Sequence, residues 1–331
     1  MRLRHARPYV LSCFMLLASS LADAQNLQPL SLISYPGGSN WPTWIAQEKG
    51  YFAQGGIEVT ITPAINSVQQ LTGLIDGKFD IATTAFDNVV AYMEGQGEVP
   101  IATQPDLVIL MSSVPSATVL TLRPEIKTFE DLRGKKVAVD ALTTGYAYIL
   151  FDMLKRNGLK LGDYEVEAVG ATPARLKGMI EGKHAAALMT LPFNFLAENA
   201  GLRNVQYTLD LYGHYQESAV ATRRSWAAAN EKKLNAFLKA FVAGIEWLRD
   251  PKNKDEAIAI YRKNLSELSP AMADKIYAMV TGPKGIPPKG ALDVAGIPKI
   301  LELRSEYGKP KKILTDPARY YDLKYYEAAL R

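Results

Sequence analysis

The chain has 331 residues, with 38 Lys and Arg against 34 Asp and Glu and a formal charge of +4. A balance this close to neutral gives no basic surface of the kind that nucleic-acid-binding proteins carry, so no nucleic-acid partner is expected. The only cysteine is Cys13, near the N-terminus. The rest of the chain therefore excludes a disulfide framework, a thiol nucleophile and a thiolate metal site.

The first 24 residues have the pattern of a secretory signal peptide. Three arginines precede an apolar stretch over 10–21, which ends at Ala22-Asp23-Ala24. That stretch is shorter than the roughly 20 residues that span a bilayer. We expect cleavage after Ala24, which would leave Gln25 first and, with three Arg and one Asp removed, a formal charge of +2. Two alternatives stay open: an uncleaved anchor, and lipidation at Cys13.

A faint internal repeat predicts two similar lobes. Ile75–Ala82 (IDGKFDIA) is echoed by Ile180–Ala187 (IEGKHAAA), and Ile57–Thr60 is echoed by Tyr164–Glu167, at offsets of 105 and 107 residues. Solenoid repeats have much shorter periods, of 20–50 residues. Two matches in the same order at nearly the same offset therefore indicate two α/β lobes.

The elements expected in the first lobe alternate between strand and helix, which is typical of a mostly parallel sheet. They are, in chain order, strand 30–34, a helix from Ser39 or Asn40 to Gly50 with Pro42 in its first turn, strand 57–61, a helix from Ser67 to just before Gly77, strand 81–83, and a helix that Asp87 opens.

The same alternation is expected in the rest of the chain. It predicts strand 135–139, a helix from Thr143 or Thr144 to Leu154, the repeated segment over 179–189, strand 218–222, a long helix over 227–248, helical segments near 254–264 and 270–280, and a tail from Gly282 that wraps the surface of lobe one. We expect residues 25–114 and 217–331 to form lobe one and residues 115–216 to form lobe two.

Four stretches resemble the substrate-binding proteins of the thiamine-pyrimidine-synthase-like group, which are type II periplasmic binding proteins related to nitrate, sulfonate and taurine binders. These stretches are 44–52 (WIAQEKGYF), 77–82 (GKFDIA), 129–139 (FEDLRGKKVAV) and 154–159 (LKRNGL). The likeness extends over roughly 28–250. The second Gly-Lys segment departs from the group's usual Gly-x-x-Asp-Ala pattern, because His184-Ala185-Ala186 stands there.

The resemblance implies a monomeric periplasmic protein whose lobes are joined by two crossover strands, near 112–117 and 215–220, and close on a small-molecule ligand. It implies delivery of that ligand to an ABC-type membrane permease, with no cofactor. A small organic anion, a carboxylate or sulfonate with aromatic ones included, is the first expectation. A neutral or zwitterionic heterocycle, such as a thiamine-precursor pyrimidine, is the alternative. A ligand-loaded partner of a membrane sensor is the other functional class.

Ligands of open α/β sheets bind beyond the carboxyl ends of the strands, so the loops there supply the candidate binding residues. In lobe one they are Tyr35, Gly38, Ser39, Asn40 and Trp41 after the first strand, and Thr84, Phe86 and Asp87 after the third. Adjacent glycines let the backbone approach a ligand, Trp41 offers a ring for stacking, and Asp87 offers a carboxylate to an amine or hydroxyl. A turn and helix caps explain the same residues without a ligand.

In lobe two the candidates are Thr143, Thr144, Gly145 and Tyr146 at one predicted helix start, Thr190, Pro192 and Phe193 at another, and Tyr215 in the second crossover. A helix start offers free N–H groups and a partial positive charge, which favour an anion. Capping alone also explains the threonines. Arg223 and Arg224 follow a strand and either grip a carboxylate or face solvent.

No enzymatic motif accompanies these loops. Outside the predicted signal peptide the histidines are His184 and His214, which do not have metal-ligand spacing. The chain has no G-x-S-x-G elbow or phosphate loop, and it lacks the cysteine-rich motif of the fungal pyrimidine synthases in the group that it resembles. We therefore expect a binding protein and not an enzyme.

Overall fold

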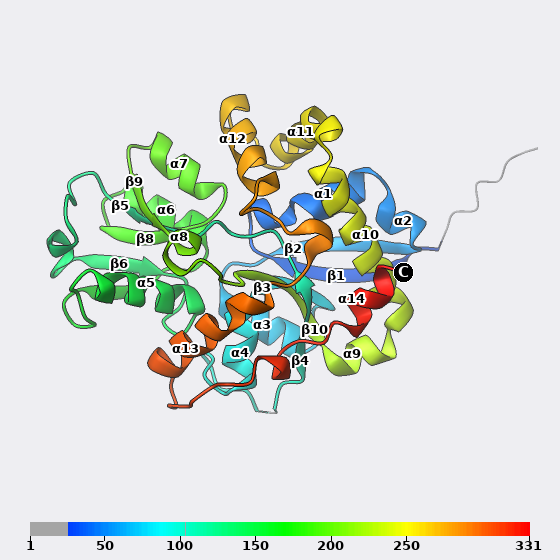
Figure 1. Cartoon of the computed structure of the whole chain (residues 1–331), viewed down its shortest axis with the longest axis horizontal. Coiled ribbons are helices and arrows are strands. Elements are labelled where there is room, and N and C mark those ends of the chain that lie inside the picture. Colours follow the sequence, from blue (N-terminus) through cyan, green and yellow to red (C-terminus); the bar gives the residue numbers. More distant parts are fainter. Residues whose placement is uncertain (1–25, 103) are drawn as a thin grey trace, which may run out of the picture.

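The computed structural model describes residues 26–102 and 104–331, and within them the chain forms two five-stranded sheets flanked by helices (Figure 1). The predicted signal peptide, residues 1–24, and its cleavage lie outside the described residues. None of the helices formed by the described part of the chain is long and apolar enough to cross a membrane.

The two sheets have the same strand order. The first sheet runs β2 (Ile57–Pro63), β1 (Gln28–Ser34), β3 (Ile81–Ala85), β10 (Ser218–Arg223) and β4 (Leu107–Ser112). The second runs β7 (Glu165–Ala168), β6 (Lys136–Val139), β8 (Ala186–Met189), β5 (Val119–Leu122) and β9 (Arg203–Tyr207). In each sheet the fourth strand, β10 or β5, is antiparallel to both neighbours and the others share one direction. The mostly parallel α/β architecture is therefore confirmed, with one reversed strand in each sheet.

The sequence repeat corresponds to equivalent positions in the two sheets. Ile57–Thr60 lies in β2 and Tyr164–Glu167 reaches into β7, which are the first strands of the two sheet orders. Ile75–Ala82 leads into β3, and Ile180–Ala187 leads into β8, both of which stand third. The repeat therefore marks two copies of one supersecondary unit.

Helices cover both faces of the sheets, and the strands β3, β4, β8 and β5 are accordingly buried along their whole length. Those around the first sheet are α1 (Trp41–Glu48), α2 (Tyr51–Gln54), α3 (Ser67–Ile75), α4 (Phe86–Met93), α9 (Arg224–Ala229), α10 (Glu231–Arg249), α11 (Lys254–Asn264), α12 (Pro270–Thr281) and α14 (Lys324–Ala329). Those around the second are α5 (Gly145–Arg156), α6 (Thr172–Ile180), α7 (Phe193–Asn199) and α8 (Thr208–Tyr212). Short 3-10 turns cover 38–40, 129–132, 251–253, 288–290, 294–296 and 317–319.

The predicted helix starts agree with the structure, which also shows how each start is capped. Thr144 caps α5, accepting a hydrogen bond from the Ala147 N–H. Asn66 caps α3, which begins at Ser67, and no side chain caps α1. The long helix predicted over 227–248 is divided into α9 and α10 at Asn230.

The chain passes between the sheets twice. It leaves the first sheet after β4 and enters the second at β5, and it returns between β9 and β10 (Figure 1). Residues 113–118 form the first crossover, and residues 213–217, after α8, form the second. Each reversed strand, β5 or β10, directly follows a crossover.

The C-terminal tail does more than wrap lobe one, which corrects the prediction. Helix α13 (Ile297–Tyr307) packs against α4 beside the first sheet and also against α5 beside the second (Figure 1). Its buried residues Ile300 and Leu303 belong to a hydrophobic cluster that contains residues of both lobes. The tail therefore helps to join the lobes.

Candidate functional site

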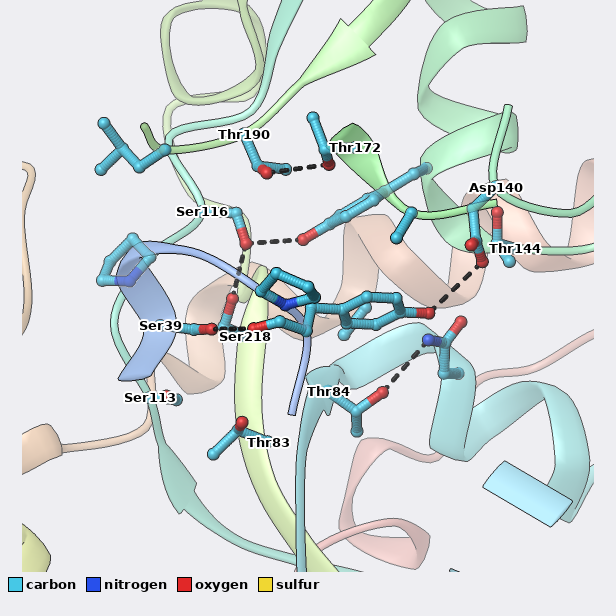
Figure 2. Close-up of a pocket in the computed structure, with 18 of the residues that line it drawn as sticks. Ser39, Thr83, Thr84, Ser113, Ser116, Asp140, Thr144, Thr172, Thr190 and Ser218 are labelled. Carbon is cyan, nitrogen blue, oxygen red and sulfur yellow. Dashed lines mark hydrogen bonds between the residues drawn. The ribbon is translucent and has the colours of Figure 1, made fainter. Parts of the chain in front are cut away.

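A cavity of about 50 Å³ lies between the two sheets (Figure 2). On the same measure a water molecule needs about 10–15 Å³, so the cavity suits a compact molecule. Hydroxyl side chains dominate its wall. The lining residues are Tyr35, Pro36, Ser39, Thr83, Thr84, Ala85, Asn88, Ser113, Pro115, Ser116, Asp140, Thr144, Tyr146, Ala171, Thr172, Arg175, Thr190, Leu191 and Ser218.

The strand registers explain why these side chains meet. In the first sheet Ser34 at the end of β1 pairs with Thr83 of β3, and Ser218 begins the reversed strand β10 beside the end of β3. In the second sheet Asp140 follows β6 and Thr190 follows β8. The carboxyl ends of the strands in both sheets thus face one space, which is where α/β sheets bind ligands.

Asp140 connects the lobes at one side of the cavity. Its Oδ2 accepts a hydrogen bond from the Tyr35 hydroxyl at 3.4 Å (Figure 2) and another from the Ser67 N–H at 3.2 Å, and both donors belong to lobe one. Its Oδ1 is buried and has no hydrogen-bond partner among the described residues. Burial, followed by the charge of Asp140, raises the pKa of Tyr35 well above its usual range, so this phenol stays protonated and donates.

Arg175 of α6 supplies the cationic group of the cavity wall. Only 2% of the residue is exposed, and its N–H groups donate to the carbonyls of Gly170 and Leu188 and to the Thr172 hydroxyl at 2.7–3.2 Å. These bonds use four of the five N–H donors of a guanidinium. Within the described part of the chain no carboxylate forms a salt bridge with it. Burial lowers its pKa, and the charge of Asp140 opposes that effect.

Hydroxyl groups join lobe two to the first crossover and to the start of β10. Ser116 Oγ, in the first crossover, lies 2.7 Å from the Tyr146 hydroxyl and 2.8 Å from Ser218 Oγ (Figure 2). In lobe two the hydroxyls of Thr172 and Thr190 lie 3.0 Å apart. Burial and, to a smaller extent, the charge of Glu217 raise the pKa of Tyr146 to about 12. This part of the wall therefore consists of neutral groups that donate and accept hydrogen bonds.

Six of the predicted binding residues line this cavity, and both lobes contribute to the set: Tyr35, Ser39, Thr84, Thr144, Tyr146 and Thr190. No bound ligand tests their role, so ligand contact stays a proposal for each.

Several predicted residues lie in hydrophobic cores instead. Trp41 is fully buried, stacks on Tyr261 with ring centroids 4.0 Å apart, and donates its indole N–H to the Ala257 carbonyl at 3.0 Å. It is therefore a core residue of lobe one and not a stacking platform for a ligand. Phe86, Phe193 and Tyr215 are likewise buried in hydrophobic core clusters. These three residues and Pro192 do not line the cavity.

Asp87 does not line the cavity either, because its carboxylate forms an ion pair with Arg304 of α13. Both residues are buried, and Arg304 Nε lies 2.6 Å from Asp87 Oδ1, with a second contact between Nη2 and Oδ2. Asn88, one residue further along α4, lines the cavity instead and donates to the Thr84 hydroxyl at 3.1 Å.

The start of α5 already has an anionic partner within the protein. The Glu98 carboxylate, from lobe one, accepts hydrogen bonds from the Thr143 N–H at 3.0 Å and from the Thr143 hydroxyl at 2.9 Å. The next residue but one, Gly145, packs against the Asp87 side chain, where a Cβ atom would lie 2.5 Å from that of Asp87. Glu98 therefore takes the Thr143 N–H and hydroxyl, and contact of the other residues at this helix start with an anionic ligand stays a prediction.

The two glycines after β1, Gly37 and Gly38, allow the backbone of lobe one to lie close to the backbone of lobe two. Gly38 donates its N–H to the Leu191 carbonyl of lobe two at 3.2 Å. A Cβ atom on Gly37, where φ is 132°, would lie 2.7 Å from the same oxygen. Asn40 turns its side-chain amide to the Tyr35 carbonyl at 2.9 Å. These residues shape the loop without lining the cavity.

The two arginines after β10 do not reach the cavity. Arg223 donates to the carbonyls of Leu74 and Phe79, and Arg224 donates to the carbonyl of Arg319. They lie at the end of β10 opposite to Ser218, so they take no part in this site.

Sequence reasoning missed the two charged residues of the wall and several of its hydroxyls. Arg175 lies inside a helix, and Asp140 directly follows a strand. Of the two, only Asp140 carried a usable signal, because the end of a central strand is a favoured ligand position. Across residues 26–102 and 104–331, no group of three or more His, Cys, Asp or Glu is arranged to hold a metal ion.

Comparison with solved structures confirms the fold. A protein from Bordetella bronchiseptica RB50 is 20% identical, with a TM-score of 0.75 over 92% of this chain and 97% of that chain. The periplasmic nitrate-binding protein NrtA from Synechocystis PCC 6803 is 16% identical, with a TM-score of 0.77 over 92% and 88%. The periplasmic aliphatic sulphonate binding protein SsuA from Escherichia coli is 19% identical, with a TM-score of 0.63 over 85% and 86%.

At these identities the structural likeness establishes the periplasmic-binding-protein fold and no ligand. No curated protein sequence matches the chain. The family model described as "NMT1/THI5 like" matches residues 40–254, which is well over half of the chain and includes residues of both sheets. The chain therefore belongs to the NMT1/THI5-like family.

Proposed function

We propose that the protein is an exported solute-binding protein that encloses a small polar molecule between its lobes and delivers it to an ABC-type permease. One observation carries the proposal: hydroxyl, carboxylate and guanidinium groups from both lobes line one cavity, which lies at the carboxyl ends of the parallel strands of both sheets. A cavity divided in this way is completed only when the lobes meet, so binding is coupled to closure.

Contacts across the cleft support this coupling. Glu98 bonds to Thr143, and Gly38 bonds to Leu191. The Ala171 N–H of lobe two also donates to the Ile65 carbonyl of lobe one at 3.0 Å. The similar nitrate and sulphonate binders are periplasmic proteins of the same fold, which favours the same role for this chain.

Binding without chemical conversion is part of the proposal. Among the described residues that line the cavity, none is a histidine or a cysteine. The buried tyrosines have raised pKa values and are poor bases at neutral pH. The wall is thus suited to hold a molecule and not to transform it.

The alternative ligand class, a neutral or zwitterionic molecule, has better support than a simple anion. The helix start on which the anion expectation depended is paired with Glu98, and the cavity wall contains both a carboxylate and a guanidinium. A net-neutral wall has no preference for an anion.

Native mass spectrometry of the protein incubated with cell extract tests the proposal. We expect one small molecule to be bound, to be released unchanged, and to reduce the radius of gyration in small-angle scattering. Uptake of that molecule should fall in cells lacking the gene. A conformation that no extract component alters would contradict the proposal, and unchanged uptake despite tight binding would favour the sensor-partner role.

A further inference from the structure

The two carboxylate oxygens of Asp140, in the cavity wall, differ in their hydrogen bonding. Asp140 is 6% exposed, and its Oδ2 has two hydrogen-bond donors, whereas its Oδ1 has none among the described residues. Leaving a buried acceptor unpaired costs about 1–3 kcal/mol, and more for a charged group. Because Asp140 lines the cavity, a molecule bound there can supply the missing donor.

The guanidinium of the same wall does not pair with Asp140 directly. Arg175 donates four hydrogen bonds, to the carbonyls of Gly170 and Leu188 and to the Thr172 hydroxyl. It therefore offsets the negative charge of Asp140 through space while leaving Oδ1 open. An incoming anion would meet a guanidinium with one N–H to spare and, in the same small space, an unpaired carboxylate oxygen.

The remaining wall is adaptable, because hydroxyl groups both donate and accept. Ser113 Oγ is a second buried oxygen without a partner among the described residues, and it lines the same cavity from the first crossover. Asp140 Oδ1 therefore requires a hydrogen-bond donor on the ligand, whereas the hydroxyl groups can pair with either a donor or an acceptor.

We propose that Asp140 is the specificity-determining residue of the cavity and that it selects ligands with an N–H group, an amine, amidine or amino-substituted heterocycle, carried by a molecule that is neutral or zwitterionic overall. The N–H group donates to Oδ1 in a charge-assisted hydrogen bond, and any acceptor of the ligand faces the Arg175 and hydroxyl side. This inference rests on the proposed function and adds the chemical class of the ligand to it.

Calorimetry on the full chain with matched pairs of probe molecules tests the role of Asp140. The pairs are β-alanine with propionate, taurine with ethanesulfonate, and 4-aminopyrimidine with pyrimidine, and only the first member of each pair carries the N–H group. We expect the N–H member of at least one pair to bind about tenfold or more tightly than its partner, since a hydrogen bond to a charged group contributes about 1.5–3 kcal/mol. This comparison needs no variant.

Asp140→Asn should abolish that advantage, because an amide in place of Oδ1 removes the charge. Asp152→Asn is the matched control: Asp152 is equally buried in lobe two but bonds to Arg156 and Tyr212 outside the cavity. Circular dichroism confirms folding of both variants. We expect the control to keep the N–H advantage.

Equal binding within every pair, tighter binding of propionate or ethanesulfonate, or an N–H advantage that survives in Asp140→Asn would each overturn the inference. Binding of an N–H-free anion with a reduced radius of gyration would overturn it and leave the solute-binding role intact. The solute-binding role itself fails only in the extract experiment described above, so the two failures are distinguishable.

Discussion

Arg304 and Asp87 form a buried ion pair between helix α13 of the C-terminal tail and helix α4, and the same guanidinium donates to the Thr143 carbonyl of lobe two at 2.6 Å. Arg304 is fully buried and also lies over the Tyr148 ring of α5, at 4.7 Å from its centroid. One side chain of the tail thus contacts both lobes at the base of the cleft. We infer that α13 stabilises the arrangement in which the cavity is enclosed.

Arg304→Met should destabilise the protein strongly. Removing one partner of a buried ion pair leaves an uncompensated charge and typically costs about 3–5 kcal/mol. Urea unfolding followed by circular dichroism measures this loss. Lys284→Met is the control, since Lys284 forms an exposed pair with Asp210 and should change stability by less than about 1 kcal/mol. Equal, small losses in both variants would show that the buried pair contributes nothing.

This ion pair shows where sequence reasoning ends. Most of the parallel strands, the main helices and the duplicated α/β unit follow from local apolar patterns, glycines and a repeat, which are visible along the chain. The strands β4, β5 and β9 were not predicted. The position of α13 is different, because a tail rich in Pro, Gly and Lys has no local mark that it will pack against two lobes. Asp87 was expected at a helix start, and its real partner lies 217 residues away.

Glu98→Ala should shift the protein toward a more open conformation. The Glu98 carboxylate accepts two hydrogen bonds from Thr143 across the cleft, and bonds to charged groups contribute about 1.5–3 kcal/mol each. Small-angle scattering of the ligand-free protein should show a larger radius of gyration for this variant. Glu130→Ala is the control, because Glu130 is exposed on lobe two and pairs only with Arg133. Identical profiles for both variants would mean that Glu98 does not hold the cleft closed.

The candidate site was foreseen in outline and missed in its charges. The expectation that ligand groups follow the strand ends brought Tyr35, Thr84, Thr144 and Thr190 to the cavity wall, and the structure places them there. Arg175 was not foreseen, because an arginine in mid-helix usually faces solvent, and only the tertiary fold shows that it is 2% exposed. Which of two neighbouring residues faces inward, Asp87 or Asn88, depends likewise on packing.

Glu217 should make stability depend on pH. It lies in the second crossover, is 3% exposed, and accepts a hydrogen bond from the Thr118 N–H of the first crossover at 3.1 Å. Burial raises the pKa of this carboxyl above 4.5, its ordinary value. The folded protein therefore holds the proton more tightly than the unfolded chain does, so this contribution is complete below the ordinary pKa and is lost as pH rises through the raised one.

Glu217→Gln removes that titration and checks the sign. Urea unfolding of parent and variant from pH 4.5 to pH 8 should show the free-energy difference moving in favour of Gln as pH rises, by at most about 1.4 kcal/mol per pH unit. Parallel profiles over this range would show that Glu217 does not titrate differently in the folded and unfolded states.

Trp41→Phe should separate core packing from ligand contact. Replacing the indole leaves the Ala257 carbonyl without its donor, and an unpaired buried group costs about 1–3 kcal/mol. The phenyl ring can keep much of the stacking on Tyr261, so the fold should persist with reduced stability. Because Trp41 is fully buried in lobe one and outside the cavity wall, the affinity of the folded variant for the molecule captured from extract should match that of the parent. Calorimetry below the unfolding transition, paired with urea unfolding, measures both quantities. A loss of affinity with unchanged stability would return Trp41 to the ligand site, whereas a loss of stability alone establishes it as a core residue.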